Sequence, residues 1–553
     1  MKKDELIFCP LGGSGEIGMN MNLYAYGNEE KQKWIIVDMG VTFADDSVPG
    51  IDLIYPDPGF ILDKKDDLLG IVLTHAHEDH IGAVAHIWPN LKCKIYATPF
   101  TAVLIQEKFK EKKIDISRSL VIVQLNGKIK LGPFEIDFIT LTHSILEPNG
   151  LSISTPAGLI LHTGDWKVDP NPLIGGDIDK KKLQEIGDKG VIAMICDSTN
   201  VFSEGRAGSE SDVRDSLLNI IEKKRNRVIV TSFASNVARM ETVFYCAKKT
   251  DRNICLVGRS MHRIYKAARL CGYMQNLIEP LDPRDAKKVA KNKIIYLCTG
   301  SQGEPMGAMN RIVNGIHSEV FLEPEDTVIF SSKIIPGNEK KLYQLQNEIA
   351  KNNVEIITEE NAFVHVSGHP NREDLKDMYG WVKPKCIIPV HGEHRHMKEH
   401  VNYAKSLQIP QTLLIENGDI VRIHPSSKPE IVDKAPSGRM YLDGAIGVSS
   451  DSQSIKERRN ISQNGYLEVT LIISNNGKFK KPIISYRGIP TDNDIENIVF
   501  DMEDEISNVC RTFSIQNKNQ EKNLIDTLKQ NCRKIMKDKT GKKPFTNINI
   551  ARI

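Results

Sequence analysis

Short apolar runs that end in polar residues occur in two separate parts of the chain, and this pattern restricts the fold more than any other feature. Five such runs lie in the first 200 residues: WIIVD, GIVLT, CKIYAT, LILHTGD and VIAMICD. Their length and composition predict buried strands. A helix is expected between some of them, for example over Thr101–Lys113. After His369 the same pattern returns in CIIPVHGEH and LLIENGDIV.

The segment between these two parts has a different pattern. SESDVRDSLLNIIEKK begins at Ser209 with helical spacing, and strand-like and helical segments then alternate up to VEIITEE. A βαβαβ rhythm predicts a largely parallel sheet covered by helices. We therefore expect an α/β protein in which one domain is inserted into another. The expected parts are 1–208 and 370–446 for the first domain, 209–369 for the insert, 447–459 for a linker and 460–553 for a C-terminal domain.

The C-terminal segment combines strand-like and helical patterns. YLEVTLIIS and KPIISYRG predict strands, and IENIVFDMEDEISNVCRTF predicts an amphipathic helix. A small α/β module of this kind can pair with a second copy about a two-fold axis. We expect it to support dimerisation.

Composition excludes several classes of protein. The 553 residues contain 73 Lys and Arg against 71 Asp and Glu, a net charge of +2, so nucleic-acid binding would need a local groove rather than bulk charge. The N-terminal MKKDELIFCPLGG lacks the apolar segment of a secretory signal, and no apolar run is long enough to span a membrane. The ten Cys are scattered, which excludes CxxC zinc ribbons and a disulfide framework. We expect a soluble, cytoplasmic protein.

The strongest chemical signal is LTHAHEDHIGA, which places His75, His77, Asp79 and His80 within six residues. In an extended segment, residues two apart face the same way, so His75 and His77 can point at one metal. Asp79 and His80 lie on the turn that follows and can point at another. Imidazole nitrogen and carboxylate oxygen suit Zn²⁺ and also Mn²⁺. The alternative is a polar surface loop with chance histidines, which three of the chain's 15 His in six residues make less favourable.

Further ligands are expected at other strand ends. His143, Asp165 and His391 each follow an apolar run, where parallel strands deliver side chains to one rim. An aspartate can bridge two ions, which makes Asp165 the natural link between two sites. His162 lies inside an apolar run and is better interpreted as a buried core residue.

Together these motifs resemble a known family. HxHxDH, a lone His, a GD strand end and a late His resemble the metallo-β-lactamase fold. The β-CASP nucleases of that superfamily, and ribonuclease J in particular, resemble this chain in PLGGSGEIGMN, ICDSTN, TSFASN, TGSQGEPM, VHVSGH and PVHGEHR, in the same order along nearly the whole chain. Ala76 departs from the pattern, which has glycine there. The resemblance implies an αββα metallo-β-lactamase domain, an inserted β-CASP α/β domain and a small C-terminal α/β domain.

The resemblance also implies roles for individual residues. His75, His77 and His143 would hold one metal, and Asp79, His80 and His391 the other, with Asp165 shared. Asp38 would orient the histidine cluster, and the catalytic residues would be His369, Asp79 and Asp197, with His369 at the scissile phosphate. The pocket for a terminal 5′-phosphate would consist of Phe233, Ala234, Ser235, His365, Val366, Ser367, Gly368 and His369.

The implied activity is two-metal hydrolysis of RNA phosphodiesters. It would combine 5′→3′ exonuclease action on 5′-monophosphate ends with endonuclease action, in the maturation of ribosomal RNA and the decay of mRNA. The implied cofactors are two divalent ions per subunit, Zn²⁺ first, with Mn²⁺ or Mg²⁺ as alternatives. The implied partners are single-stranded RNA, further copies of the chain in a homodimer or homotetramer, and RNA-decay or ribosome-associated proteins, without a membrane.

Other interpretations remain open at this point. Gly13–Gly18 matches GxGxxG, but a strand pattern follows it rather than the helix of a dinucleotide site, so a Gly-rich hairpin is favoured. A β-CASP nuclease that acts on DNA has the same motifs. A metal-free RNA-binding scaffold would have lost ligands, whereas all seven positions are filled here. A small-molecule metallohydrolase would not need the long insert between Asp197 and His369.

Overall fold

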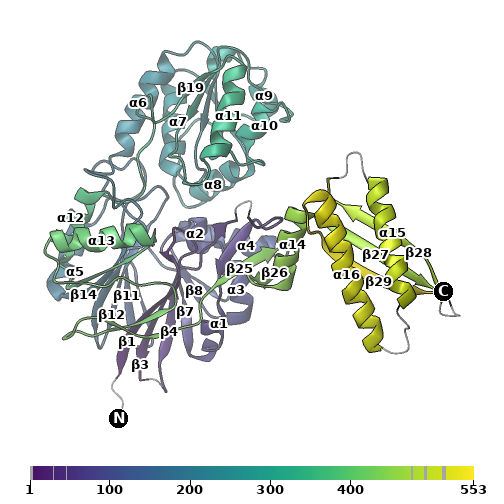
Figure 1. Ribbon diagram of the computed structural model, residues 1–553. Helices are drawn as coiled ribbons and strands as arrows, with labels where there is room; N and C mark the ends of the chain where they lie inside the picture. Colours follow the sequence, from purple (N-terminus) through teal and green to yellow (C-terminus); the bar gives the residue numbers. More distant parts are fainter. Residues whose placement is uncertain (1–3, 29, 45–46, 475–477, 491–494, 513–517) are drawn as a thin grey trace. The chain divides into compact units, whose positions relative to one another are not determined.

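The computed structural model describes residues 4–28, 30–44, 47–474, 478–490, 495–512 and 518–553. Contacts divide the chain into two compact units, Met1–Thr42 with Tyr55–Gly438 and Phe43–Ile54 with Arg439–Ile553. Figure 1 shows both units and labels many of their elements. Among the described residues, no helix combines the length and the apolar character that crossing a bilayer requires.

The first unit contains two large sheets. One sheet consists of β1 (Glu5–Gly12), β3 (Met21–Gly27), β4 (Lys33–Val37), β7 (Leu68–Val72), β8 (Ile95–Ala97), β9 (Leu120–Ile122), β23 (Asp419–Ile423) and β24 (Glu430–Lys434). Their order is β24-β23-β1-β3-β4-β7-β8-β9. The other sheet consists of β10 (Lys128–Leu131), β11 (Phe134–Thr140), β12 (Asn149–Thr155), β13 (Gly158–His162), β14 (Val191–Asp197), β20 (Cys386–Val390) and β22 (Gln411–Thr412). These strands follow the order β10-β11-β12-β13-β14-β20-β22.

The two sheets pack against each other through one hydrophobic core. Phe8 and Val37 of the first sheet share this core with Phe138 and Ile388 of the second. Because alternate side chains of a strand point to opposite faces, each sheet offers one apolar face to the other. The strands at 386–390 and 419–423 complete these sheets, as expected from the return of the strand pattern after His369.

Helices cover the outer faces of both sheets. Beside β8 and β9 lies α4 (Pro99–Glu111), close to the expected helix, with α3 (Val84–Leu91) next to it. The outer face of the second sheet packs on α5 (Lys180–Lys189), α12 (Arg372–Val382) and α13 (His394–Ser406) (Figure 1). The layers are therefore αββα, as the resemblance implied. Short elements complete this part: α1 (Gly59–Leu62), α2 (Glu78–Ile81), β2 (Ser14–Gly15) and β21 (Gly392–Glu393).

The inserted segment forms a separate parallel sheet. Its strands are β15 (Val228–Thr231), β16 (Asn253–Val257), β17 (Ile294–Cys298), β18 (Thr327–Phe330) and β19 (Glu355–Ile357), in the order β16-β17-β15-β18-β19. Every pairing is parallel, as the βαβ rhythm predicted. Helix α6 (Glu210–Glu222) precedes the first of these strands, and the helices between the strands are α7 (Val237–Lys249), α8 (Arg259–Leu270), α9 (Pro283–Ala286), α10 (Ala308–Val313) and α11 (Glu339–Lys351). Helix α6 begins after Ser209, whose side chain accepts a hydrogen bond from the Ser211 backbone N–H.

The second unit contains the C-terminal residues. A four-stranded sheet has the order β26-β25-β6-β5, from β5 (Thr42–Phe43), β6 (Leu53–Pro56), β25 (Arg439–Asp443) and β26 (Ile446–Ser449). Helix α14 (Gln453–Asn464) leads to a sheet of β27 (Tyr466–Ile473), β28 (Phe479–Arg487) and β29 (Phe545–Arg552), which packs on α15 (Ile495–Thr512) and α16 (Lys518–Thr540). The expected linker 447–459 therefore contains the end of β26 and the first half of α14.

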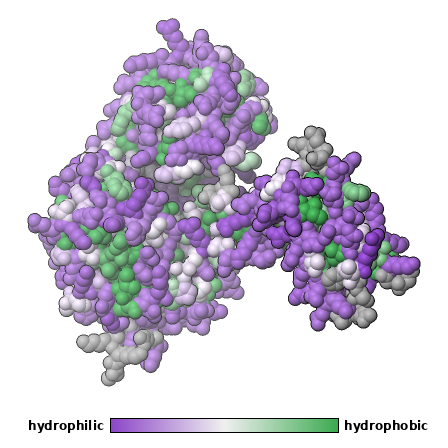
Figure 2. All heavy atoms as spheres, in the orientation of Figure 1, coloured by the Kyte–Doolittle hydropathy of each residue, from purple (hydrophilic) through white to green (hydrophobic). Residues whose placement is uncertain are grey.

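The surface is mainly polar. On the face that Figure 2 shows, hydrophilic residues surround small hydrophobic patches. Apolar atoms make up a large part of any protein surface, so isolated patches of this size are ordinary.

Strand ends place the polar motifs together. β4 and β7 are parallel neighbours in the first sheet, and β13, β14 and β20 are parallel neighbours in the second. Their carboxyl ends lead to Asp38, His75, Asp165, Asp197 and His391. The two sheets thus deliver these side chains to the same edge of the sandwich.

Candidate metal centre and substrate pocket

The structure brings the predicted ligands into overlapping groups. The donor atoms of each group lie within 4.8 Å of one another, and the groups are His75, His77, His143 and Asp165; Asp79, His80, Asp165 and His391; and Asp165, Asp197, His369 and His391. All seven predicted metal ligands are present in the first two groups. Nitrogen and oxygen donors in sets of four match what Zn²⁺ and similar divalent ions accept.

Asp165 lies at the centre of these groups. Its Oδ2 is 3.2 Å from His80 Nε2, 3.4 Å from His391 Nε2, and 3.8 Å from the Nε2 atoms of His75 and His143. Its Oδ1 is buried without a hydrogen-bond partner among the described residues. Because an unpartnered buried carboxylate oxygen is costly, the site suits a bound cation.

Hydrogen bonds outside the centre orient three of its histidines, whereas His77 turns Nδ1 toward His75 and His143 (3.2 and 3.0 Å). His80 Nδ1 donates to Asp38 Oδ2 (2.7 Å), and His143 Nδ1 donates to the Gly368 carbonyl (2.5 Å). His75 Nδ1 lies 2.9 Å from Thr74 Oγ1, which itself donates to Asp38 Oδ2. With Nδ1 protonated in this way, each Nε2 presents a lone pair to the centre.

The protonation equilibria of the centre favour bound cations. Burial lowers the pKa of His75 and His143, so both are neutral and can donate lone pairs. Burial alone would raise the pKa of Asp165, but His391 and His80 lower it well below its usual range. Burial lowers the pKa of His369, yet Asp197 and Asp165 raise it to about 9. The carboxylates of Asp165 and Asp197 thus stabilise positive charge in the centre. Metal binding would displace the protons held by imidazoles that the metal contacts.

Asp38 supports this arrangement from the first sheet. Its carboxylate accepts hydrogen bonds from the Thr74 backbone N–H (2.8 Å) and the Thr74 hydroxyl (2.7 Å). It follows β4 in the left-handed region, with φ 62°, and His391 has φ 51°. Such a backbone conformation is strained for residues other than glycine and needs surrounding contacts to hold it. The hydrogen bonds from Thr74 hold the Asp38 carboxylate in place, and this carboxylate in turn fixes His80 through Nδ1.

We expect Asp38→Asn to weaken metal binding by about 10- to 100-fold, the usual effect of losing a carboxylate that orients a ligand. The amide keeps the shape of the side chain but loses the charge that holds His80 Nδ1. Metal retention against increasing chelator measures the effect. Asp326→Asn is the matched control, because that carboxylate is also buried but pairs with Arg227 in the inserted domain. Equal metal loss in both variants would contradict the role of Asp38.

Asn20 contacts the centre, and sequence reasoning assigned it no role. Its Nδ2 lies 3.1 Å from His80 Nε2 and 2.9 Å from His391 Nδ1. Its backbone N–H donates to the Asp79 carbonyl (2.9 Å). The signal was available, because Asn20 ends the PLGGSGEIGMN motif that carried part of the resemblance. The same motif forms β2, which pairs with β21 directly after His391.

Two loops of the inserted domain approach the centre. Ser235 Oγ lies 3.1 Å from His77 Nε2, and Phe233 and Ala234 are half-buried on the same turn. In the second loop, Ser367 Oγ accepts hydrogen bonds from Asn200 Nδ2 (2.6 Å) and the His369 backbone N–H (3.1 Å). A side chain at Gly368 would meet His143 at 2.8 Å, so this position needs glycine.

The remaining predicted pocket residues differ in exposure. Val366 is buried, and His365 is half-buried with an Nδ1 that has no partner among the described residues. His369 is 23% exposed, and its Nδ1 lies 2.8 Å from Asp197 Oδ2. Asp197 thereby orients His369 rather than a ligand of the first two groups.

A buried ion pair fixes the second loop. The Arg239 guanidinium is fully buried, pairs with Glu210 (3.0 Å) and donates to the carbonyls of Val364 and Ser331 (both 2.8 Å). Breaking a buried pair of this kind strongly destabilises a protein, since it leaves one charge uncompensated. The contact at Val364 holds the chain one residue before His365.

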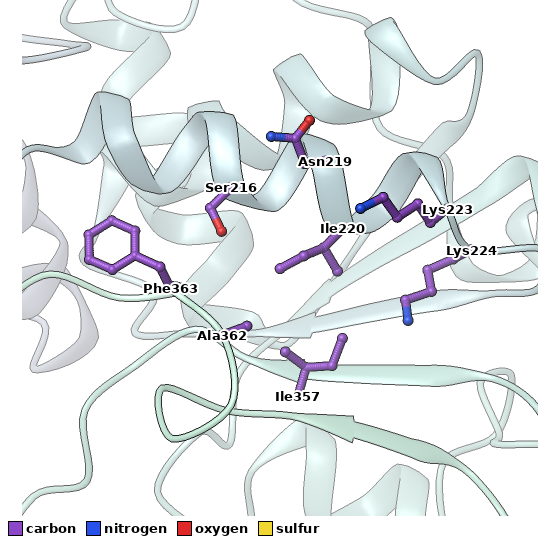
Figure 3. A pocket seen from close by; sticks show the side chains of 8 residues that line it. All are labelled: Ser216, Asn219, Ile220, Lys223, Lys224, Ile357, Ala362 and Phe363. Atoms are coloured by element: carbon purple, nitrogen blue, oxygen red, sulfur yellow. The ribbon is translucent and has the colours of Figure 1, made fainter.

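A groove in the inserted domain is distinct from the ligand groups around Asp165. It has a volume of about 520 Å³ and lies between α6 and the loop after β19. Figure 3 shows its lining, which contains no His, Asp or Glu: Ser216, Asn219, Ile220, Lys223, Lys224, Ile357, Ala362 and Phe363. Its residues therefore supply no ligands of the kind found around Asp165.

Several histidines lie outside the centre. His162 is buried and its Nδ1 bonds the Tyr24 hydroxyl (2.8 Å), which fits the core interpretation. His394 is exposed, whereas His396 and His400 are buried. Their positions on α13 turn them toward the sheet, and His400 bonds Ser198 (2.8 Å).

Comparison with known families gives matches along most of the chain. The family model described as "Metallo-beta-lactamase superfamily" matches residues 22–231, and "Ribonuclease J, beta-CASP domain" matches 225–349. "Zn-dependent metallo-hydrolase RNA specificity domain" matches 353–413, and "Ribonuclease J C-terminal domain" matches 453–553. The order agrees with the order of the sheets described above.

Comparison with individual proteins extends over the full length. The chain is 37% identical to "Ribonuclease J" of Sinorhizobium meliloti over 552 residues, covering 100% of this chain and 98% of that protein. It is 33% identical to "Ribonuclease J" of Helicobacter pylori strain B128, covering 98% and 79%. A crystal structure of a protein of unknown function from Enterococcus faecalis shares the fold, with a TM-score of 0.52 and 16% identity, over 76% of this chain and 100% of that one. The chain therefore belongs to the ribonuclease J family of metal-dependent RNA nucleases.

Proposed function

We propose that this chain hydrolyses RNA with two divalent ions, as a 5′→3′ exonuclease that prefers 5′-monophosphate ends and as an endonuclease. The observation that carries the proposal is the position of Asp165 Oδ2, which lies between the two predicted ligand groups at 3.2 to 3.8 Å from four imidazole nitrogens. One carboxylate that faces both groups is the arrangement that two adjacent ions require.

We assign His75, His77 and His143 to one ion and Asp79, His80 and His391 to the other, with Asp165 shared. His75, His80, His143 and His391 are buried, and hydrogen bonds at Nδ1 turn the Nε2 lone pairs of His80 and His143 toward the centre, which supports this assignment. Zn²⁺ is the first candidate, because histidine and carboxylate ligands in sets of four suit it. When bound, such ions lower the pKa of a water molecule and stabilise the charge that develops on the scissile phosphate.

His369 is the proposed proton donor to the leaving oxygen. Its Nδ1 bonds Asp197 Oδ2 at 2.8 Å, which holds the ring in place and stabilises its protonated form. The ring lies beside those of His391 and His143, with centroids 5.6 and 5.1 Å away. A proton held on the His369 ring can reach an oxygen of a phosphate that contacts the centre.

The proposed pocket for a terminal 5′-phosphate lies between the two loops of the inserted domain. Hydroxyls of Ser235 and Ser367 and the backbone N–H groups of both loops donate hydrogen bonds without reading a base. Because Ser235 contacts His77 and Gly368 contacts His143, a phosphate bound there would place the chain end next to the centre. That geometry favours removal of residues from the 5′ end.

Timed digestion of end-labelled RNA tests this function. Matched oligonucleotides carry a 5′-monophosphate or a 5′-triphosphate, and a DNA of the same sequence is digested in parallel, with and without chelator. We expect release of single nucleotides from 5′-monophosphorylated RNA and no cleavage with chelator. Faster digestion of the DNA would instead support a DNA-acting nuclease.

Ser367→Ala tests the 5′-phosphate pocket in the same assay. The hydroxyl accepts hydrogen bonds from Asn200 and the His369 backbone N–H, which leaves its own proton for the phosphate, so its loss should slow exonuclease action on 5′-monophosphate ends by about tenfold, the value of one charge-assisted hydrogen bond. Endonuclease action should fall less. Equal losses on monophosphate and triphosphate substrates would argue against the pocket.

We also propose that residues 460–553 support a homodimer or a tetramer built from such dimers, and that RNA-decay or ribosome-associated proteins are partners. The packed sheet and helices of this segment support a self-contained module. Light scattering on the full chain and on a chain that ends near 458 distinguishes a dimer that depends on this module from one that does not.

A further inference from the structure

Phe202 is an exposed aromatic side chain beside the reaction centre. It is 50% exposed and lies on the loop that follows β14. The same loop begins with Asp197, which bonds His369, and contains Asn200, which bonds Ser367. Only Val201 separates Phe202 from Asn200, whose side chain contacts the proposed substrate pocket.

The loop is held in place, so the exposure of the ring is a feature of the fold. The Ser203 backbone N–H donates to the Asn200 carbonyl (2.8 Å), and Arg372 donates to the Val201 carbonyl through Nε (2.9 Å) and to the Ser203 carbonyl through its backbone N–H (3.1 Å). Val201 itself is fully buried. Burial of a phenyl ring would stabilise the fold, and a ring that is held exposed forgoes this stabilisation. Such a ring indicates a binding site only where its surroundings also suit a ligand.

The surroundings of the ring come from the first turn of α13. The His396 ring is buried and meets Phe202 edge-on, with centroids 5.3 Å apart, and the Arg395 guanidinium lies 5.9 Å from the centroid of Phe202. We call Phe202, Arg395 and His396 the aromatic ledge. An edge-on partner supports a ring without covering both of its faces.

Two contacts fix the segments that carry the aromatic ledge relative to the centre. The Thr199 hydroxyl donates to the carbonyl of His391 (3.1 Å), which links the Phe202 loop to the segment that leads into α13. A Cβ at Gly392 would meet both Ser198 and His396 at 3.0 Å, so the two segments pack closely. The ledge therefore has a constant position relative to His391 and Asp197.

We propose that the aromatic ledge stacks against a base of the single-stranded RNA substrate, close to the scissile phosphate. This inference rests on the proposed function. Aromatic rings and arginine side chains are the groups on which proteins stack splayed-out bases, and stacking tolerates any sequence. The exposed carboxylates of Glu393 and Glu204 pair with Arg395 and Arg372 (both 2.7 Å), so the ledge has little free positive charge to hold a phosphate, which favours a base there. Arg395 and His396 also fall within the match to the RNA specificity domain.

The test compares Phe202→Ala with Phe202→Trp on 5′-monophosphorylated single-stranded RNA. We expect Phe202→Ala to raise KM and the Kd measured by fluorescence anisotropy in chelator by about 5- to 100-fold, the loss of one stacked base. kcat should change little, because the ring touches no reacting atom. Phe202→Trp should restore binding, since it offers a larger stacking face.

Phe321→Ala is the matched control. Phe321 is 38% exposed and has two cations over its ring, Arg227 and Lys287. Arg227 directly precedes β15, so this ring lies at the amino end of the inserted sheet, whereas the loop that carries Ser235 follows the carboxyl end. RNA binding should be unchanged in this variant.

A scan with single abasic nucleotides makes the test specific for stacking. At one position of the RNA, a missing base should weaken binding to the unaltered protein but not to Phe202→Ala. An identical abasic profile for both proteins, or an unchanged Kd for Phe202→Ala, would overturn the proposal. Binding in chelator does not require cleavage, so a protein that fails to cleave RNA but shows this pattern would refute the proposed function alone.

Discussion

Asp165→Asn is expected to reduce RNA cleavage by about 10³-fold or more. The proposed role of the carboxylate is to contribute to both metal sites, and a cation that stabilises transition-state charge contributes several kcal/mol, each 1.36 kcal/mol being tenfold in rate. Asparagine has the same shape, so packing is retained. It removes the one negative charge that faces His75, His80, His143 and His391 together.

Metal content distinguishes the cause of this loss. The Asp165→Asn protein should bind fewer divalent ions per chain, measured by elemental analysis after dialysis, and should remain folded by circular dichroism. His162→Asn is the matched control, because His162 is buried three residues earlier but bonds Tyr24 instead of the centre. It should lose thermal stability and keep its metal. Full metal content with near-normal turnover in Asp165→Asn would contradict the ligand assignment.

His369→Ala is expected to lower kcat by about 10²- to 10⁴-fold, the usual contribution of a general acid. KM should change less, since the hydroxyls of Ser235 and Ser367 remain. The effect of Asp197→Asn should be smaller, because that residue acts through His369 Nδ1. If Asp197 acts through His369, Asp197→Asn should lower kcat little further in a protein that already carries His369→Ala.

His424→Ala is the control for His369→Ala. His424 is exposed and its Nδ1 only accepts a hydrogen bond from the Ser426 backbone N–H. Its replacement should leave kcat unchanged. Additive losses in the double variant of His369 and Asp197 would indicate that the two residues act independently.

Much of the fold could be predicted from local patterns. The run before His75 is β7, the run before Asp165 is β13, and the run before His391 is β20. Helix α6 begins directly after Ser209, where the side chain was expected to start a helix. Each of these features depends on residues near one another in the chain, and hydrophobic periodicity and capping report such features directly.

The segment 447–459 was harder to interpret. Its polar composition favoured a linker, yet Ile455 is fully buried in α14. Arg458 pairs with Asp443 at 2.6 Å. A helix that buries a single apolar residue gives almost no periodic signal, so only its contacts with β25 and its neighbours identify it.

The sequence by itself determined which chemistry is present: three imidazoles and the carboxylate of Asp79 within six residues, and polar residues at the ends of apolar strands. Tertiary structure decided which of these groups meet. Asn20 reaches His80 and His391, Asp38 holds His80, and Arg239 holds the chain before His365, across separations of up to 371 residues. Such contacts follow from strand order and sheet packing, which no local pattern encodes, and the burial they create gives the charges around Asp165 their strength.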